Sequence, residues 1–297
     1  MTAGDDPAAP APDRIGLGIL HMVAGVFCLG ILNALVKLLA ARHAIVEIAF
    51  FRSLFALIPA SAMVIAAGGW RTLATRHPWG HVWRGLCGLC SMYLLFWSFD
   101  LLPLADAVAI GFSAPLFLTA LSVPLLGERV GAHRWGAVLV GFAGVLVIAH
   151  PGGEAVTSLG SVVALASAVT YAFTMITIRK LGRTERSSTI VFHFMLMATF
   201  LSAFPLPFFW VTPTPAELGL LIATGFCGGL TQHLITRAYT LAPAAVIGPF
   251  NYTAILWATL LGYLIWCDLP DRPVAAGAAI VVMSGLFLVW RETRRRS

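Results

Sequence analysis

The stretch Gly85-Leu86-Cys87-Gly88 returns 140 residues later as Gly225-Phe226-Cys227-Gly228, and both copies lie inside hydrophobic segments. The same offset relates Leu101-x-Pro103-x-Ala105 to Leu241-x-Pro243-x-Ala245 and aligns Glu128 with Asp268. In a chain with many apolar segments, such a repeat is typical of two similar helical bundles that enclose a site near the bilayer midplane. The repeat therefore predicts a fold of two related halves.

Composition places the chain among membrane proteins. Of its 297 residues, 59% are hydrophobic and 11% are charged, and the mean hydropathy is +0.88. Soluble domains carry about 25% charged residues, so this chain has too little polar surface to fold in water. The net charge of +6 comes from short basic clusters between apolar runs, which indicates membrane orientation rather than nucleic-acid binding. Cys87-x-x-Cys90 is interpreted as helix packing, and we expect no metal and no cofactor.

Apolar stretches long enough to span a bilayer recur along the chain. A spanning helix needs about 20 mostly apolar residues. The stretches that meet this requirement cover residues 15–38, 46–68, 80–102, 104–126, 132–149, 158–181, 187–209, 216–240, 244–266 and 273–290. We therefore predict an all-α membrane protein with ten transmembrane helices, arranged as two five-helix repeats around a central cavity.

The distribution of Lys and Arg orients these helices. With the N-terminus inside, the inner loops hold the cluster at 179–186 and the Arg-rich end at 291–296, whereas the outer loops hold only Lys37, Arg42 and Arg272. Positive charge is enriched on the cytoplasmic side of membrane proteins. We therefore expect both termini in the cytoplasm. The predicted segments are a disordered N-terminus, two repeats and a basic tail, at residues 1–14, 15–150, 151–290 and 291–297.

An odd number of crossings per half has a topological consequence, because the second half then enters the membrane from the other side. The ends of the first and sixth predicted helices, Val36-Lys37-Leu38 and Arg179-Lys180-Leu181, look related. The charge distribution nevertheless places them on different faces. The halves are therefore predicted to be inverted about an axis in the membrane plane.

Several motifs, taken in order, resemble a known family. Phe51-Arg52 lies on the second predicted helix, Gly127-Glu128 closes the fourth, and Gly136-x-x-x-x-Gly141-x-x-Gly144 lies on the fifth. Together with the Lys-Leu helix ends, they resemble the drug/metabolite transporter superfamily, EamA type, over residues 15–290. The second half departs from this pattern, with Cys267-Asp268 where the Gly-Glu pair would stand.

Within that superfamily, the chain looks most like the bacterial aromatic amino-acid exporters. The resemblance implies a secondary transporter of the bacterial inner membrane that exports aromatic or other hydrophobic amino acids by alternating access. The alternative is an uptake carrier for riboflavin or an S-adenosylmethionine-like metabolite. We expect a small-molecule substrate and the lipid bilayer as partners, and a monomer or weak dimer.

The predicted helix at 216–240 carries the most informative polar residues. His233 and Arg237 are spaced i, i+4 and share a face with Gly229, and Gln232 precedes His233. Such a stripe would bind the carboxylate of an amino acid. The alternative is a hydrogen-bond network buried between helices.

The 140-residue offset places Tyr93 and Trp97 opposite His233 and Arg237. Aromatic rings would then face polar groups across one cavity, which suits a cargo with a ring and a charged head. Packing against lipid or the protein core is the alternative interpretation of these rings. The remaining predicted lining residues of the substrate site are Asn33, Tyr171, Thr174, Asn251 and Tyr252.

Most charged residues in the apolar segments lie close to predicted helix ends, where interfacial anchoring or a helix-end salt bridge is expected. They are Arg52, Arg84, Asp100, Asp106 and Arg237. The first predicted helix contains no Asp or Glu, so a proton-driven mechanism lacks its usual carrier and facilitated transport is the simpler reading. His233 leaves proton coupling open.

Two rival classes of protein fit less well. A membrane-embedded enzyme needs clustered carboxylates, a His-Asp pair or a metal set, and the 13 acidic residues show no such grouping beside a His. The sequence contains no Gly-Lys-Ser nucleotide-binding loop, so it predicts no intrinsic ATPase. A receptor would need no central cavity, and the near-complete internal repeat argues against it. We therefore expect a transporter and not an enzyme.

Pro115 and Pro249 interrupt the fourth and ninth predicted helices, which are related by the repeat. Each proline removes a backbone hydrogen bond and permits a kink, so we expect both to act as hinges. Replacing each by Ala should slow transport in proteoliposomes. Unchanged rates in both Pro115→Ala and Pro249→Ala would show that these positions are not hinges.

Overall fold

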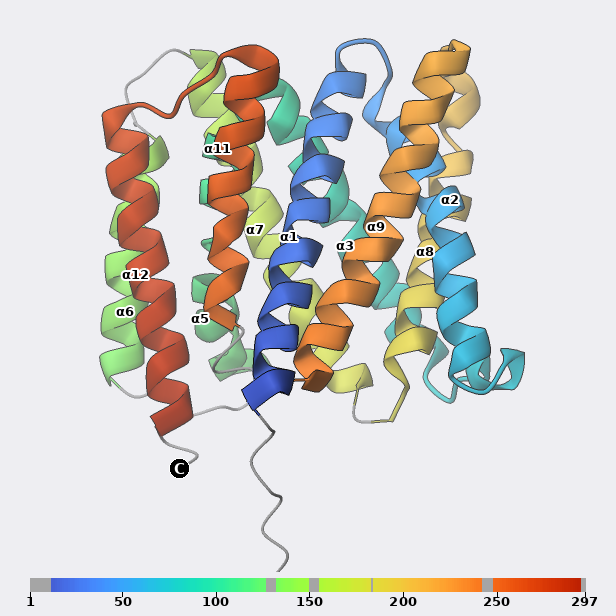
Figure 1. Ribbon diagram of the computed structural model, residues 1–297, viewed down its shortest axis with the longest axis horizontal. Coiled ribbons are helices and arrows are strands. Elements are labelled where there is room, and N and C mark those ends of the chain that lie inside the picture. The colour runs from blue at the N-terminus through green and yellow to red at the C-terminus, as the bar shows by residue number, and fades with distance from the viewer. Residues whose placement is uncertain (1–11, 127–131, 150–154, 183, 242–247, 295–297) are drawn as a thin grey trace, which may run out of the picture.

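The computed structural model of the protein is built from helices that run between two faces of the molecule (Figure 1). The first helix begins and the last helix ends at the same face, which we call the terminal face; the other is the opposite face. The residues that the structure describes are 12–126, 132–149, 155–182, 184–241 and 248–294.

The described α-helices are α1 (Pro12–Ala40), α2 (Ile45–Ala66), α3 (Pro78–Leu101), α4 (Leu104–Gly111), α5 (Ala114–Leu126), α6 (Ala132–Ala149), α7 (Ala155–Leu181), α8 (Ser187–Ala203), α9 (Pro215–Leu241), α11 (Thr253–Trp266) and α12 (Arg272–Arg294). Short 3₁₀ helices accompany them at η1 (Trp70–Leu73), η2 (Leu206–Phe208) and η3 (Gly248–Tyr252). Within the described residues the chain is therefore helical, as the apolar stretches predict.

Many of these helices can cross a bilayer. Among the described residues, six are long and apolar enough: Ile15–Ala40, Ile45–Ala66, Pro78–Leu101, Leu104–Leu125, Leu159–Ile178 and Pro215–Tyr239. Shorter apolar helices cover Trp135–Val147, Ser187–Ala203, Phe250–Trp266 and Arg272–Phe287. The chain is accordingly a multi-pass membrane protein.

Two predicted boundaries differ from the structure at the ends of the chain. Helix α1 begins at Pro12, so part of the segment predicted to be disordered is helical, and residues 1–11 lie outside the described residues. Proline is well suited to a first helical position, because its missing N–H needs no partner there. Helix α12 continues to Arg294, so most of the predicted basic tail is helical as well.

The fourth and ninth predicted helices are each divided. The first of these ends at Gly111, and α5 starts at Ala114 after a turn in which the Ser113 hydroxyl donates to the Ile110 carbonyl at 2.6 Å. Pro115 lies in the first turn of α5, where it cannot donate to the preceding helix. The ninth predicted helix consists of η3, which contains Pro249, followed by α11. The hinge role of the two prolines remains a prediction, and Gly127-Glu128 lies outside the described residues.

Helices from the two halves of the chain alternate in the packing. Helix α1 packs along α9, α3 along α7, α2 against α8, and α6 against α12; Figure 1 shows α1 beside α9 and α6 beside α12. A reciprocal pair joins α3 to α7, in which the Ser91 hydroxyl donates to the Ser167 carbonyl at 3.2 Å and the Ser167 hydroxyl donates to the Ser91 carbonyl at 3.0 Å. Such small polar contacts hold helices together in lipid.

Glycines permit the closest approaches between these helices. A methyl group added at Gly225 would lie 2.5 Å from Cβ of Phe55 and 3.0 Å from the Arg52 carbonyl oxygen, so α9 contacts α2 closely at this point. At Gly144, it would lie 2.9 Å from the Gly277 carbonyl oxygen, where α6 meets α12. The repeated motif around Gly225 therefore serves helix packing, as the sequence predicts for its Cys87-x-x-Cys90 counterpart.

Replacing Gly225 by Ala should destabilise the protein by about 1–3 kcal/mol, because the new methyl group overpacks the α2–α9 contact. Gly219 lies on the same helix with open space around its Cα, so Gly219→Ala provides the matched control. The measurement is the apparent melting temperature of the purified protein in detergent. Equal melting temperatures for the two variants would contradict the close contact.

Candidate functional site

Ion pairs connect the two halves of the chain at the opposite face. The Lys37 ammonium donates to the Leu102 carbonyl at 2.7 Å, lies 3.7 Å from the Asp268 carboxylate and lies 5.1 Å from the Trp266 ring. Helices α1, α3 and α11 therefore meet around one cation. The sequence repeat aligns Asp268 with Glu128 at the end of a predicted helix. In the structure, Asp268 pairs with Lys37.

A second polar cluster lies where α2 and α9 begin. The His43 ring lies 3.0 Å from Oε2 of Glu47 and 3.6 Å from Oε2 of Glu217, and Arg42 lies 3.0 Å from the other Glu217 oxygen. Glu47 is completely buried and also accepts a hydrogen bond from the Val211 backbone N–H at 3.4 Å. This cluster holds the loop between α1 and α2 against α9.

Hydrogen bonds also join the two halves at the terminal face. Thr75 donates to the Glu185 carboxylate at 2.6 Å, and Thr189 donates to the Thr72 carbonyl at 2.8 Å. Arg186 donates to the Ala67 carbonyl. These bonds hold the loop between α2 and α3 against the loop between α7 and α8. At the opposite face, the contacts of the loop between α1 and α2 with the start of α9 are the counterpart in the sequence repeat.

Arg84 on α3 is a buried cation in the part of the bundle where α3 packs against α7 and α8. It is 8% exposed, and its Nε and Nη1 atoms have no hydrogen-bond partner among the described residues. Its guanidinium lies 4.0 Å from the ring centroid of Phe194. No described carboxylate lies within ion-pair distance of it. The helix-end salt bridge expected for Arg84 is absent among the described residues, because the close contact of α3 with α8 encloses the side chain; its expected interfacial position remains a prediction.

Arg52 on α2 is a similar case closer to the opposite face. Its Nη1 donates to the Met92 sulfur at 2.9 Å, its guanidinium lies 5.9 Å from the Phe96 ring, and its buried Nε has no hydrogen-bond partner. The helix-end salt bridge expected for Arg52 is absent among the described residues, and its expected interfacial role remains a prediction. Two guanidinium groups therefore lie inside the helix bundle without a carboxylate partner among the described residues.

Two histidines lie beside Arg84. The rings of His81 and His193 have centroids 4.4 Å apart. The His193 Nδ1–H donates to the Thr189 carbonyl at 2.9 Å, whereas neither ring nitrogen of buried His81 has a hydrogen-bond partner. The sequence offers no local signal for this pair, because the two residues lie on α3 and α8, over a hundred positions apart.

Some of the predicted substrate-binding residues lie near Arg84. Tyr171 on α7 is 47% exposed and lies within electrostatic range of Arg84 and of Tyr239 on α9. The Tyr239 hydroxyl accepts a hydrogen bond from the Asn251 amide at 3.2 Å. Helices α3, α7 and α9 and the 3₁₀ helix η3 thus contribute polar or aromatic groups to one region, which we call the Arg84 region.

The other predicted lining residues are distributed more widely. Tyr93 shares a hydrogen bond of 2.8 Å with Ser202, Thr174 donates to the Thr170 carbonyl at 3.0 Å, and Tyr252 lies 4.9 Å from the Phe112 ring. Tyr93 and Tyr252 are thereby engaged in contacts between helices, whereas the Thr174 hydroxyl bonds within α7. Asn33 is buried, Gln232 is half-buried, and the exposed ones are Trp97, His233 and Arg237.

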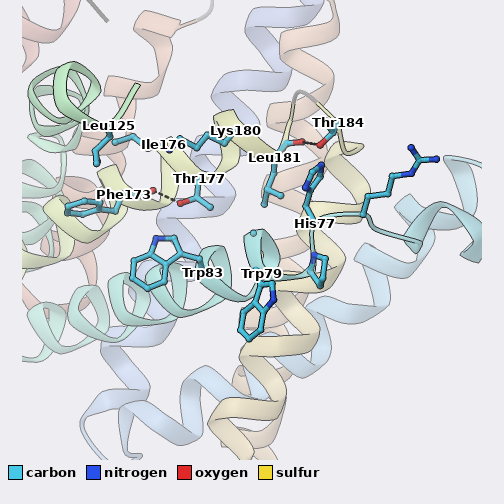
Figure 2. A pocket seen from close by; sticks show the side chains of 13 residues that line it. His77, Trp79, Trp83, Leu125, Phe173, Ile176, Thr177, Lys180, Leu181 and Thr184 are labelled. Carbon is cyan, nitrogen blue, oxygen red and sulfur yellow. Dashed lines mark hydrogen bonds between the residues drawn. The ribbon is translucent and has the colours of Figure 1, made fainter. Parts of the chain in front are cut away.

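A groove of about 640 Å³ lies at the terminal face between the start of α3 and the ends of α5 and α7. Figure 2 shows Trp79 and Trp83 of α3 across from Phe173 and Thr177 of α7. We call it the Trp79–Trp83 groove. The residues that line it are Arg76, His77, Pro78, Trp79, Gly80, Trp83, Leu125, Phe173, Ile176, Thr177, Lys180, Leu181 and Thr184. None of the ten residues predicted for the substrate site is among them.

The sequence matches the model of the EamA-like transporter family twice, over residues 16–150 and 158–291. The chain therefore belongs to the EamA-like transporter family, as its motifs predict. A solved crystal structure with 21% sequence identity has the same fold, with a TM-score of 0.65 and coverage of 97% of this chain and 100% of the other.

Characterised relatives have different cargoes. An S-adenosylmethionine uptake transporter of Rickettsia bellii is 30% identical over 88% of this chain and 89% of its own length. A pseudopaline exporter of Pseudomonas aeruginosa is 31% identical over 93% and 97%. A riboflavin transporter of Rhizobium johnstonii is 27% identical over 97% and 95%.

The buried cluster at the opposite face leads to a stability prediction. Glu47→Ala should lower the apparent melting temperature, because it leaves the buried His43 Nδ1 and Val211 N–H without their acceptor, at about 1–3 kcal/mol for each unsatisfied group. Asp100→Ala, at an exposed position in the last turn of α3, is the matched control. A Glu47→Ala melting temperature equal to that of the control would show that the cluster contributes no stability.

Proposed function

We propose that the protein is a secondary transporter that moves a small amphipathic metabolite by alternating access. In this proposal, residues 15–150 and 151–290 form inverted five-helix halves with ten spans in all. The contacts between the halves support this arrangement. The first helix of the first half, α1, packs on α9, and the first helix of the second half, α7, packs on α3. The presence of both described chain ends at the terminal face also requires an even number of crossings. The basic clusters indicate that this face is cytoplasmic.

The observation that carries the proposed cargo is the buried guanidinium of Arg84. An unpaired buried ion is more costly than a paired one. Arg84 has no carboxylate partner among the described residues and retains two buried donor atoms without hydrogen bonds. A guanidinium binds carboxylates through two parallel hydrogen bonds, so a carboxylate on the cargo would complete this site.

The surroundings of Arg84 favour a cargo that also contains a ring. Phe194 covers one side of the guanidinium, and Tyr171 and Tyr239 lie in the same region. Asn251, bonded to Tyr239, adds an amide. An aromatic amino acid has both a ring and a carboxylate, so we propose export of aromatic or other hydrophobic amino acids. We propose that the exposed residues Trp97, His233 and Arg237 line the path by which the cargo reaches the Arg84 region.

A second candidate cargo is an S-adenosylmethionine-like metabolite, which the relative in Rickettsia favours. S-adenosylmethionine also has a carboxylate and a ring, so it would suit the Arg84 region. Riboflavin has a ring system without a carboxylate, and for that reason we rank it below the other two.

The test is counterflow in proteoliposomes with labelled tryptophan, phenylalanine, S-adenosylmethionine and riboflavin. Indole-3-propionate keeps the carboxylate of tryptophan, whereas tryptamine keeps only the amine. We expect the first compound to compete and the second to fail, because Arg84 would bind the carboxylate. Competition by tryptamine alone would contradict the proposed role of Arg84.

Arg84→Gln should weaken transport of the carboxylate cargo by roughly 10- to 100-fold, the value of a hydrogen bond to a charged group. Arg84→Lys should retain part of the activity, since it keeps the charge but loses the fork of donors. Arg71→Gln removes an exposed cation elsewhere on the terminal face and should leave transport unchanged. Full activity in Arg84→Gln would overturn the cargo proposal while leaving the family assignment intact.

A further inference from the structure

The Trp79–Trp83 groove lies on the outer side of the α3–α7 pair. On α7 its lining residues Phe173, Thr177 and Lys180 recur every three or four positions and therefore share one face of the helix. Tyr171, which lies toward Arg84, precedes Phe173 by two positions and so points roughly 160° away from it. The groove is thus separate from the Arg84 region and opens away from it.

Two cations at the rim of the groove have no acidic partner. Arg76 and Lys180 are both exposed, and neither forms an ion pair with any residue that the structure describes. Glu185, in the same loop region, accepts the hydrogen bond of Thr75. The Thr177 hydroxyl donates within α7 to the Phe173 carbonyl at 2.9 Å, and the Thr184 hydroxyl, in the turn after α7, donates to the Leu181 carbonyl at 3.3 Å (Figure 2). The groove is therefore positively charged at its rim.

The other side chains of the groove suit a hydrocarbon chain. Leu125, Phe173 and Ile176 form an apolar wall. Trp79 and Trp83 lie one turn apart at the start of α3 and are 81% and 59% exposed. Tryptophan is enriched at the level of lipid headgroups, because its ring is apolar and its N–H is polar. Cations beside apolar grooves at the cytoplasmic side of membrane helices bind anionic headgroups.

We propose that the Trp79–Trp83 groove binds an anionic phospholipid of the inner leaflet. Arg76 and Lys180 contact the phosphate, the two tryptophans flank the headgroup and glycerol region, and an acyl chain lies along Leu125, Phe173 and Ile176. The lipid thereby joins the start of α3 to the ends of α5 and α7. A soluble anion lacks the acyl chain and would leave the apolar wall unused, so the combination of charge and apolar surface favours a lipid.

The experiment is native mass spectrometry of the full-length protein in detergent, titrated separately with cardiolipin, phosphatidylethanolamine and inorganic phosphate. We expect cardiolipin to remain bound where the other two do not. The double variant Arg76→Gln with Lys180→Gln should bind cardiolipin roughly 30-fold more weakly, from about one basic-residue contribution at each position. The control double variant, Arg71→Gln with Arg272→Gln, removes the same charge at exposed positions outside the groove and should bind like the wild type.

Quenching of tryptophan fluorescence by brominated cardiolipin provides the second measurement. Trp79→Phe with Trp83→Phe should lose most of the quenching, whereas Trp70→Phe with Trp210→Phe, at exposed positions outside the groove, should keep it. An unchanged elution volume and melting temperature identify variants that remain folded. Equal loss of cardiolipin in both charge variants, equal binding of phosphatidylethanolamine, binding of phosphate, or unchanged quenching in the groove variant would each overturn the proposal.

Discussion

Helices inside a bilayer gain no hydrophobic stabilisation from packing together, because lipid tails are as apolar as their side chains. The bundle therefore depends on close approach at small residues, where dispersion contacts and short polar bonds are strongest. Gly225 against Phe55, Gly144 against Gly277 and the Ser91–Ser167 pair are contacts of this kind. Each joins helices from different halves of the sequence, so the same constraint that stabilises the bundle also makes the halves interlock.

Interlocked helices create enclosed positions for charged groups. Arg84 and Arg52 lie where three helices meet, and the aromatic rings of Phe194 and Phe96 cover their guanidinium groups. Several charges at the two faces, by contrast, have partners: Lys37 pairs with Asp268, Arg42 with Glu217, and Glu185 accepts from Thr75. The unpaired guanidinium of Arg84 inside the bundle is the physical reason for proposing that the cargo binds there.

Sequence patterns predicted the helices well because the bilayer imposes a length and a composition on every crossing. The predicted helix boundaries differ from the structure at the N-terminus, where α1 starts at Pro12, and near Pro115, where the fourth predicted helix is divided between Gly111 and Ala114. The predicted site residues remain predictions. Tyr171 lies within electrostatic range of Arg84, yet the sequence predicted only an interfacial or helix-end role for Arg84, since position along one helix does not reveal which neighbours enclose a side chain.

The sequence by itself determined the class of protein, the positions of the apolar helices, the repeat and the family, because hydropathy and motif spacing are local properties of the chain. Only the tertiary structure decided which polar residues meet. The contact of His81 with His193, the enclosure of Arg84 by Phe194 and the groove between α3, α5 and α7 all join residues far apart in sequence. Their proximity results from the way α3 packs on α7 and α8, and helix-to-helix distances of that kind leave no local pattern in a sequence.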